Sequence, residues 1–302
     1  MSTVIYTDTT ITSPRVVILG DIGANRKPFY GRLREIGVRT STNEIPGDLV
    51  IIQIGDLIGR APDASAEIIR HVRALRHRNP GQWVQLIGNR EARYHPYGAR
   101  FAPSERRTHR DLDVAHQKIL NGFWREPHTG VAAAISTRRM SPTLLTHAGV
   151  TREFLQAIGA TNHINARKVA HDINFSLADP NLRQHVFALG QMYRGLEPGP
   201  LGASHGELWR SWHHHPLSFD QIVGHTNPYR FSKNRWNDAN PIPETQWATP
   251  NPPRRMTYWK PSKSNFGIAH IDPGLWHGST TDELPAHLFE DATVTISQPQ
   301  PR

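Results

Sequence analysis

Six short apolar runs, each followed by a polar residue, constrain the fold of this 302-residue chain more than any other feature. The runs are continuous and rich in Val, Ile and Leu, which is typical of strands buried on both faces. They are RVVILG (15–20), LVIIQIG (49–55), WVQLIG (83–88), TLLT (143–146), QIVG (221–224) and FGIAHI (266–271), and they are followed by Asp21, Asp56, Asn89, His147, His225 and Asp272. Each of these polar side chains is of a type that can ligate a metal ion.

Helices are predicted between the runs. The segment 63–78 has apolar residues at helical spacing, and 28–36 is a weaker helix between the first two strands. Further on, 152–158 and 166–189 read as helices, the second broken at Pro180. Alternating strands and helices predict an α/β layer fold, in which ligands bind beyond the carboxyl ends of the strands. We therefore expect the six polar residues to lie along one edge of the sheet.

The composition excludes several classes of protein. The chain has no cysteine, which excludes a disulfide scaffold, a thiolate zinc site and a cysteine nucleophile. Hydrophobic residues make up 37% of the chain, enough to fill a core. The N-terminus lacks the pattern of a signal peptide, and no apolar run approaches the ~20 residues that span a bilayer. These observations predict a cytoplasmic protein that does not associate with a membrane.

The chain is strongly basic, with 35 Lys and Arg residues against 26 Asp and Glu, a formal charge of +9. Such a charge suits anionic partners, and it is equally compatible with an ordinary basic enzyme. No zinc-finger spacing, aromatic RNA-binding signature or recognition-helix pattern accompanies the charge. Nucleic acid is therefore not expected as a specific partner.

Three of the runs end in Gly-Asp or Gly-Asn, at 20–21, 55–56 and 88–89. Glycine allows the backbone to turn sharply where the strand ends, and the next side chain then projects beyond the sheet. One Gly-Asp pair or one strand-end histidine is more often structural than functional, whereas the ordered series is far more specific. Two carboxylates, one amide and two imidazoles favour Mn, Fe or Zn over calcium.

This ordered series resembles the calcineurin-like metallophosphoesterases, nearest the branch of phosphoprotein phosphatases and symmetrical diadenosine tetraphosphatases. The family pattern is GD-x-H, GD-x-x-x-R, GN-H-[DE], [TA]-H-[AG]-G and GH. The chain has GDIG (20–23), GDLIGR (55–60), GNRE (88–91), THAG (146–149) and GHT (224–226). The resemblance covers about residues 15–275. It implies a four-layer α/β/β/α sandwich with a metal site at the C-terminal ends of the strands.

The resemblance also implies roles for individual residues. One metal ion would be bound by Asp56, Asn89, His147 and His225, and Asp56 would be shared with another ion bound by Asp21. Arg60 matches the family's phosphate-binding arginine. In the family a metal-activated water attacks the phosphorus atom in line, without a covalent enzyme intermediate. The implied activity is metal-dependent hydrolysis of a phosphoester or phosphoanhydride in a small molecule, a nucleotide or a phosphoprotein.

Two residues depart from the family pattern. Gly23 stands where the family has a histidine ligand of the first ion, so that ion is held more weakly unless Asn25 or a water replaces the imidazole. Arg90 stands where the family has the histidine that protonates the leaving group. An arginine stays charged and is a poor general acid, but it can bind phosphate with two hydrogen bonds. The departures leave two alternatives: an enzyme with one or two ions that favours good leaving groups, or a degenerate relative that binds a phosphorylated ligand without turnover.

A segment before the last histidine resembles a Leu-Trp segment of many phosphoprotein phosphatases, which has a phosphate-binding arginine nearby. Arg210 or Arg194 could take that role, or the tryptophans 209 and 212 could simply pack beneath the site. Three consecutive histidines, 213–215, are expected to lie in a solvated loop. Asp272 is expected to support the ligands rather than to bind an ion.

The chain is predicted to form one calcineurin-like domain over residues 1–278, with inserted loops at about 98–140 and 227–264. Residues 279–302 are predicted to be a C-terminal extension with a strand at 292–296 and a flexible end.

Overall fold

The computed structural model describes residues 6–95, 97, 112–160, 165–188, 196–231, 234–236, 248–260, 264–272, 284 and 286–299. None of the helices within these ranges has the length and apolar character needed to cross a membrane.

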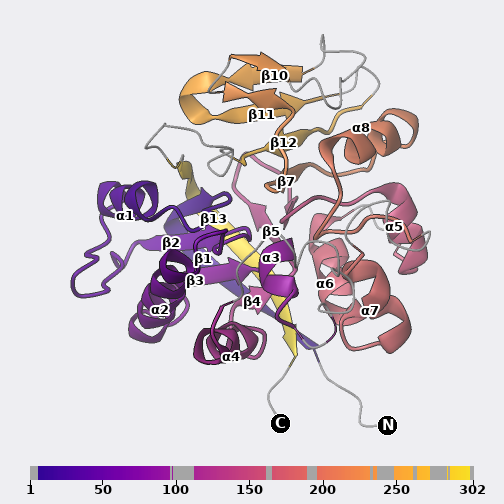
Figure 1. The fold of residues 1–302 in the computed structure, drawn as a ribbon. Helices are drawn as coiled ribbons and strands as arrows, with labels where there is room; N and C mark the ends of the chain where they lie inside the picture. The colour runs from indigo at the N-terminus through magenta and orange to yellow at the C-terminus, as the bar shows by residue number, and fades with distance from the viewer. Residues whose placement is uncertain are drawn as a thin grey trace.

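An eleven-stranded sheet runs through the molecule in the order β10-β11-β12-β7-β6-β5-β13-β1-β2-β3-β4 (Figure 1). Its strands are β1 (Tyr6–Leu19), β2 (Leu49–Gln53), β3 (Trp83–Leu86), β4 (Thr129–Gly130), β5 (Ala132–Ser136), β6 (Thr143–Thr146), β7 (Gln221–Val223), β10 (Ala248–Asn251), β11 (Met256–Trp259), β12 (Ile268–His270) and β13 (Ala286–Pro299). The strands β1 to β4 are parallel to one another, and so are β6, β7 and β12. Two parallel groups of strands therefore end at the site described below.

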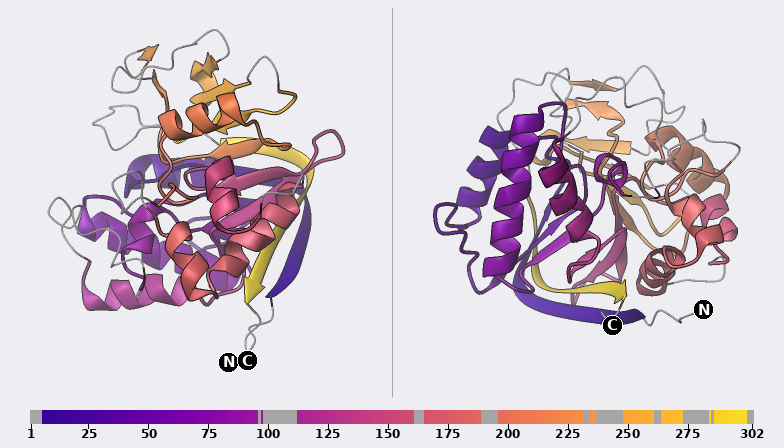
Figure 2. Two further views of the ribbon diagram at one scale, coloured as in Figure 1. Left: turned by 90° about the vertical axis from the view of Figure 1, so that its right-hand side faces the viewer. Right: turned by 60° about the horizontal axis from the view of Figure 1, so that its bottom comes forward.

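Two long strands join the two halves of the sheet. β1 and β13 pair antiparallel from Tyr6 opposite Pro299 to Leu19 opposite Ala286, and β13 also pairs with β5. Figure 2 shows these two strands side by side along a curved path. The pairing is interrupted at Pro14, which has no amide hydrogen to donate, and at Asp291, whose φ is 45°. The irregularity bends both strands where they pass from one half to the other.

Helices cover the outer face of each half (Figure 1). One set lies against β1 to β3 and the other against β5 and β6, while α3 follows β3 after a turn at residues 87–88. The first set is α1 (Arg26–Glu35), α2 (Pro62–Arg78) and α4 (Val114–Phe123); the second is α5 (Arg152–Ala157), α6 (Ala166–Ser176) and α7 (Pro180–Val186); α3 (Asn89–Ala92) and α8 (His205–His214) complete the described helices. The break predicted at Pro180 is present, because proline begins α7 as its first residue.

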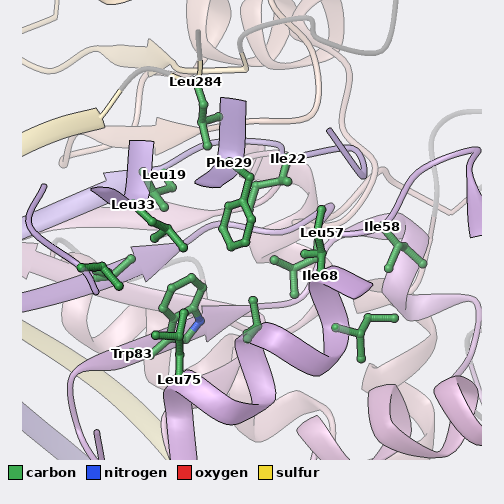
Figure 3. Packing of buried hydrophobic residues seen from close by; sticks show 14 of the residues in the cluster. Leu19, Ile22, Phe29, Leu33, Leu57, Ile58, Ile68, Leu75, Trp83 and Leu284 are labelled. Atoms are coloured by element: carbon green, nitrogen blue, oxygen red, sulfur yellow. The ribbon is translucent and has the colours of Figure 1, made fainter. Parts of the chain in front are cut away.

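The buried side chains alternate between layers, as the two-residue period of a strand requires. In β2, Leu49 and Ile51 face the helices, whereas Val50 and Ile52 face the other half of the sheet. In β6, Leu144 faces its helices and Leu145 faces inward. Figure 3 shows the packing of the first helical cluster around Phe29, Leu33, Leu75 and Trp83. The sheet is thus folded over a central core and covered by helices on both sides, which confirms the predicted four-layer α/β/β/α architecture.

Several predicted boundaries differ from the structure. The segment predicted as a loop at 98–140 contains α4, β4 and β5 in its described part, since the alanine-rich β5 (AAAIS) becomes a strand only by pairing with β6 and β13. The predicted loop at 227–264 contains β10, β11 and a small pair, β8 (Tyr229–Arg230) with β9 (Arg235–Trp236). The predicted extension at 279–302 supplies β13, which lies inside the sheet rather than beyond it.

Candidate metal centre

The ends of two groups of parallel strands meet at one place. Leu19, Gln53 and Gln85 are level with one another in β1, β2 and β3, and Thr146 is level with Val223 in β6 and β7. The residues that follow these strands are Asp21, Asp56, Asn89, His147 and His225. The first four are at most 7% exposed, whereas His225 is half-buried. All five therefore lie at the carboxyl edge of the sheet, where the sequence predicts them.

Three side chains converge on the Nε2 atom of His147, which makes a group of four potential donors. This nitrogen lies 3.1 Å from Nδ1 of His225, 3.2 Å from Oδ1 of Asn89 and 3.5 Å from Oδ1 of Asp56. Each of these atoms has a lone pair to offer a cation, and the mixture of oxygen and imidazole suits Mn, Fe or Zn. The residues present therefore fit one divalent ion.

The protonation of the two histidines agrees with this role. Burial lowers the pKa of His147 and of His225 to about 3, and for His225 the neighbouring His147 adds to the effect. Both imidazoles are therefore neutral at physiological pH. The Nδ1 atom of His147 donates to the carbonyl oxygen of Ile54 at 3.1 Å, which leaves Nε2 unprotonated and directed at the other donors.

The strand ends can approach this closely because glycine precedes the ligands. A Cβ atom on Gly88 would lie 2.3 Å from Oδ1 of Asp56, and one on Gly224 would lie 2.3 Å from Oδ1 of Asp21. Asp56 and His225 themselves have left-handed backbones, with φ of 54° and 61°. Such conformations cost of order 1 kcal/mol or more for residues other than glycine and concentrate at functional sites.

Glu91 supports the site in a way that the sequence interpretation missed. Its carboxylate accepts hydrogen bonds from the amides of Asp56 and Gly88, both at 2.9 Å, and from the amide of Ile58 at 3.1 Å. It thereby ties the turn after β2 to the turn after β3. The only signal in the sequence is its place in the GNRE motif.

A pair of buried glutamines stabilises the turns at the strand ends through hydrogen bonds. Gln53 accepts from the amide of Gly55 at 3.0 Å and donates to the carbonyl oxygen of Gly20 at 3.2 Å, and Gln85 donates to Gln53. Both side chains are fully buried. Their signal in the sequence is a single polar residue inside each of two otherwise apolar runs.

Asp21 lies close to the four-donor group, but few other side chains near it could complete the ligand set of a further ion. One of its oxygens, Oδ1, accepts from the amide of His225 at 3.0 Å. Burial and the nearby carboxylates of Asp272 and Asp56 raise its pKa well above the ordinary value. Gly23 offers no side chain, and the amide of Asn25 donates to the carbonyl oxygen of Ile22 at 2.9 Å. Asn25 thus uses its amide nitrogen within its own turn.

Arg90 makes an ion pair with Asp56. Its Nε lies 2.9 Å from Oδ2 of Asp56, its backbone amide donates to Oδ1 at 3.1 Å, and its Nη1 donates to the carbonyl oxygen of Ile58 at 3.3 Å. The side chains of Arg90 and Asp56 are 5% and 4% exposed. A fixed positive charge therefore lies against one of the predicted metal ligands.

The remaining predicted arginines lie elsewhere or outside the described residues. Arg60 is exposed at the turn into α2. Arg210 is exposed on α8 and lines a cavity of about 240 Å³ together with Glu207, Ser211 and His214, none of which is a predicted ligand. Arg194 lies outside the described residues.

Trp212 is buried in a cluster with Ala148 and Val223, and Trp209 packs against it, so these tryptophans do pack beneath the histidine strands. The histidines 213–215 are exposed, but the first two belong to the last turn of α8 rather than to a loop.

Comparison with known proteins finds similarity to solved structures only. No protein-family profile matches the sequence, and no curated protein is similar to it. Among solved structures, the cold-active protein-tyrosine phosphatase of a psychrophilic Shewanella species is 15% identical, with 92% of this chain and 76% of that chain covered and a TM-score of 0.48. A protein serine/threonine phosphatase from Saccharomyces cerevisiae is 10% identical, with 91% and 79% covered and a TM-score of 0.44.

A candidate diadenosine tetraphosphatase is 13% identical, with 96% of both chains covered and a TM-score of 0.41.

Proposed function

We propose that this protein is a metal-dependent phosphoesterase that hydrolyses a phosphoester or phosphoanhydride. The observation that carries the proposal is the convergence of Asp56, Asn89 and His225 on the unprotonated Nε2 of His147. Four buried or half-buried donors from four strand ends are costly to assemble, because each loses its hydration. A bound cation is the partner that offsets this cost.

The four donors would hold a divalent ion, for which manganese, iron and zinc are the predicted candidates. Such an ion supplies Lewis acidity to a water molecule and to a phosphoryl oxygen. The half-buried side chain of His225 marks the side from which solvent and substrate reach the site. Arg60 is exposed and follows the ligand Asp56 by four positions in the sequence, and it is the proposed phosphate ligand. A phosphorylated anion as substrate also suits the overall charge of +9.

The substrate is proposed to have a good leaving group. Arg90 occupies the motif position of the proton donor, and a guanidinium does not donate its proton at neutral pH. General acid catalysis contributes about 10²- to 10⁴-fold, and an alkoxide leaving group needs that help most. Phosphoanhydrides and aryl phosphates need general acid catalysis least.

A cytoplasmic location remains a prediction from the sequence.

The test is hydrolysis of 4-nitrophenyl phosphate, a dinucleoside polyphosphate and a simple alkyl phosphate with added manganese. We expect turnover of the first two, and turnover of the alkyl phosphate slower by roughly 100-fold or more. His147→Ala should reduce every rate to that of a metal-free sample, whereas His213→Ala, which removes an exposed histidine on α8, should leave the rates unchanged. Equal rates in wild type and His147→Ala would contradict the proposal.

A second candidate function is binding of a phosphorylated ligand without turnover. The paired departures at Gly23 and Arg90 favour it, because they remove one ligand and the proton donor of the family pattern together. Saturable binding of a phosphorylated nucleotide that requires His147, with no release of phosphate over many hours, would support this candidate against the first.

A further inference from the structure

We propose that Arg90 supplies the second positive charge at Asp56, so that the chain binds one metal ion where the family pattern has two. This inference rests on the proposed function in one respect only, that an ion binds at the four donors around His147. It goes further by stating how many ions bind and which side chain sets that number.

The first argument is how the oxygens of Asp56 are used. Oδ1 faces His147 and also accepts the backbone amide of Arg90, whereas Oδ2 accepts Nε of the same arginine at 2.9 Å. A carboxylate shared by two ions must present lone pairs to both. Here the guanidinium already lies against the oxygen that does not face His147. Its Nη1 is also bonded to the carbonyl oxygen of Ile58, which holds it in that position.

The second argument is the ligand set on the far side of Asp56. Gly23 has no side chain, and the amides of Ile22 and Gly23 both donate to the carbonyl oxygen of Asp56, at 3.0 and 2.8 Å. The side-chain amide nitrogen of Asn25 donates to the carbonyl oxygens of Ile22 and Gly23 in the same turn, at 2.9 and 3.3 Å. Asp21 and the nearby Asp272 are the carboxylates at this position, and one oxygen of Asp21 already accepts from the amide of His225. A second ion would be held weakly here, so the charge of Arg90 is enough to exclude it.

The experiment counts manganese ions. The chain is dialysed to equilibrium against manganese chloride, and bound manganese, iron and zinc per chain are measured by mass spectrometry of the metals. Electron paramagnetic resonance then distinguishes an isolated ion from a coupled pair. All samples carry asparagine in place of histidines 213–215, because that exposed tract is itself able to bind metal.

Three proteins are compared: the chain with Arg90, Arg90→Lys, which keeps the charge, and Arg90→Gln, which removes it. We expect one isolated ion with Arg90 and with Arg90→Lys, and a second, coupled ion in Arg90→Gln. A merely structural role of Arg90 would change stability without changing this number.

A coupled pair in the chain with Arg90 would overturn the inference while leaving the proposed function intact, and so would a single ion in Arg90→Gln. No bound manganese, iron or zinc in the chain with Arg90 would overturn the proposed function and this inference with it. If Arg90→Gln does not fold, the other two proteins still decide between one ion and a coupled pair.

Discussion

At the scale of single residues, the site depends on positions where a side chain is missing as much as on those where one is present. Gly224 allows the end of β7 to pass beside Asp21, whose Oδ1 would lie 2.3 Å from a Cβ atom at this position. The same oxygen accepts the amide of His225. A single methyl group at Gly224 would therefore displace a carboxylate and a histidine together.

Gly224→Ala is expected to weaken manganese binding by about tenfold or more and to destabilise the fold by roughly 1–3 kcal/mol through overpacking. Isothermal titration with manganese and urea unfolding measure the two effects. The matched control is Gly122→Ala in α4, where a Cβ atom meets nothing within 4 Å. That change should leave metal binding unaltered and should stabilise the helix by about 0.5–1 kcal/mol. Equal behaviour of the two variants would contradict the close-approach argument.

At the scale of elements, β13 contributes most to the central core. Ala292, Val294 and Ile296 all point between the two halves of the sheet and are fully buried, whereas Leu288 on the same strand is 55% exposed. One strand thus offers both a buried and an exposed aliphatic side chain for comparison.

Ile296→Ala is expected to reduce the free energy of unfolding by about 2–5 kcal/mol, because it removes buried methyl groups and leaves a cavity between the halves. Leu288→Ala, its control, should change the free energy by no more than about 0.5 kcal/mol. Urea denaturation followed by circular dichroism gives both values. A loss of less than 1 kcal/mol in Ile296→Ala would show that the central core is not packed as described.

Elements with a strong local pattern could be predicted, and those made by distant pairing could not. The run 143–146 coincides with β6, and the helix predicted at 63–78 matches α2 to within one residue. By contrast, AAAIS in β5 has no strand-like composition, and it forms a strand because β6 and β13 lie on either side of it. The strand predicted at 292–296 extends over 286–299 because β1 offers it a partner along its whole length.

At the scale of the whole molecule, the ligands could be predicted but their surroundings could not. The carboxyl ends of parallel strands lie at one edge of the sheet, so the residues that follow them come close together in such a fold. The direction of a long side chain such as Arg90 depends on neighbours from another strand, here Asp56 and Ile58. Its ion pair therefore had no signal in the sequence.

Acid is expected to destabilise the molecule, because several histidines are buried in neutral form. In β13, burial together with Arg254 and Arg32 lowers the pKa of His287 to about 4, from 6.5. As the pH falls below 6.5, the unfolded chain takes up a proton that the folded chain does not. The stability that depends on neutral His287 is therefore complete above pH 6.5 and is lost progressively toward pH 4.

The measurement compares unfolding free energies at pH 7 and pH 5 in wild type and in His287→Gln, which does not titrate. Between these values His287 should account for about 2 kcal/mol of the acid-induced loss in wild type, so the variant should lose that much less. His215→Gln, an exposed control, should lose as much as wild type. An unchanged pH dependence in His287→Gln would show that this histidine is not held neutral.

The pairing of β1 with β13 also sets the order of events during synthesis. The side chains of Thr12 and Thr293 form a hydrogen bond across 281 positions of the chain. β1 therefore leaves the ribosome long before β13 has been made. One edge of β1 stays unpaired during that time, whereas its other edge can already pair with β2. The central core closes only when β13 arrives, so the waiting edge is where we expect a chaperone to protect the growing chain.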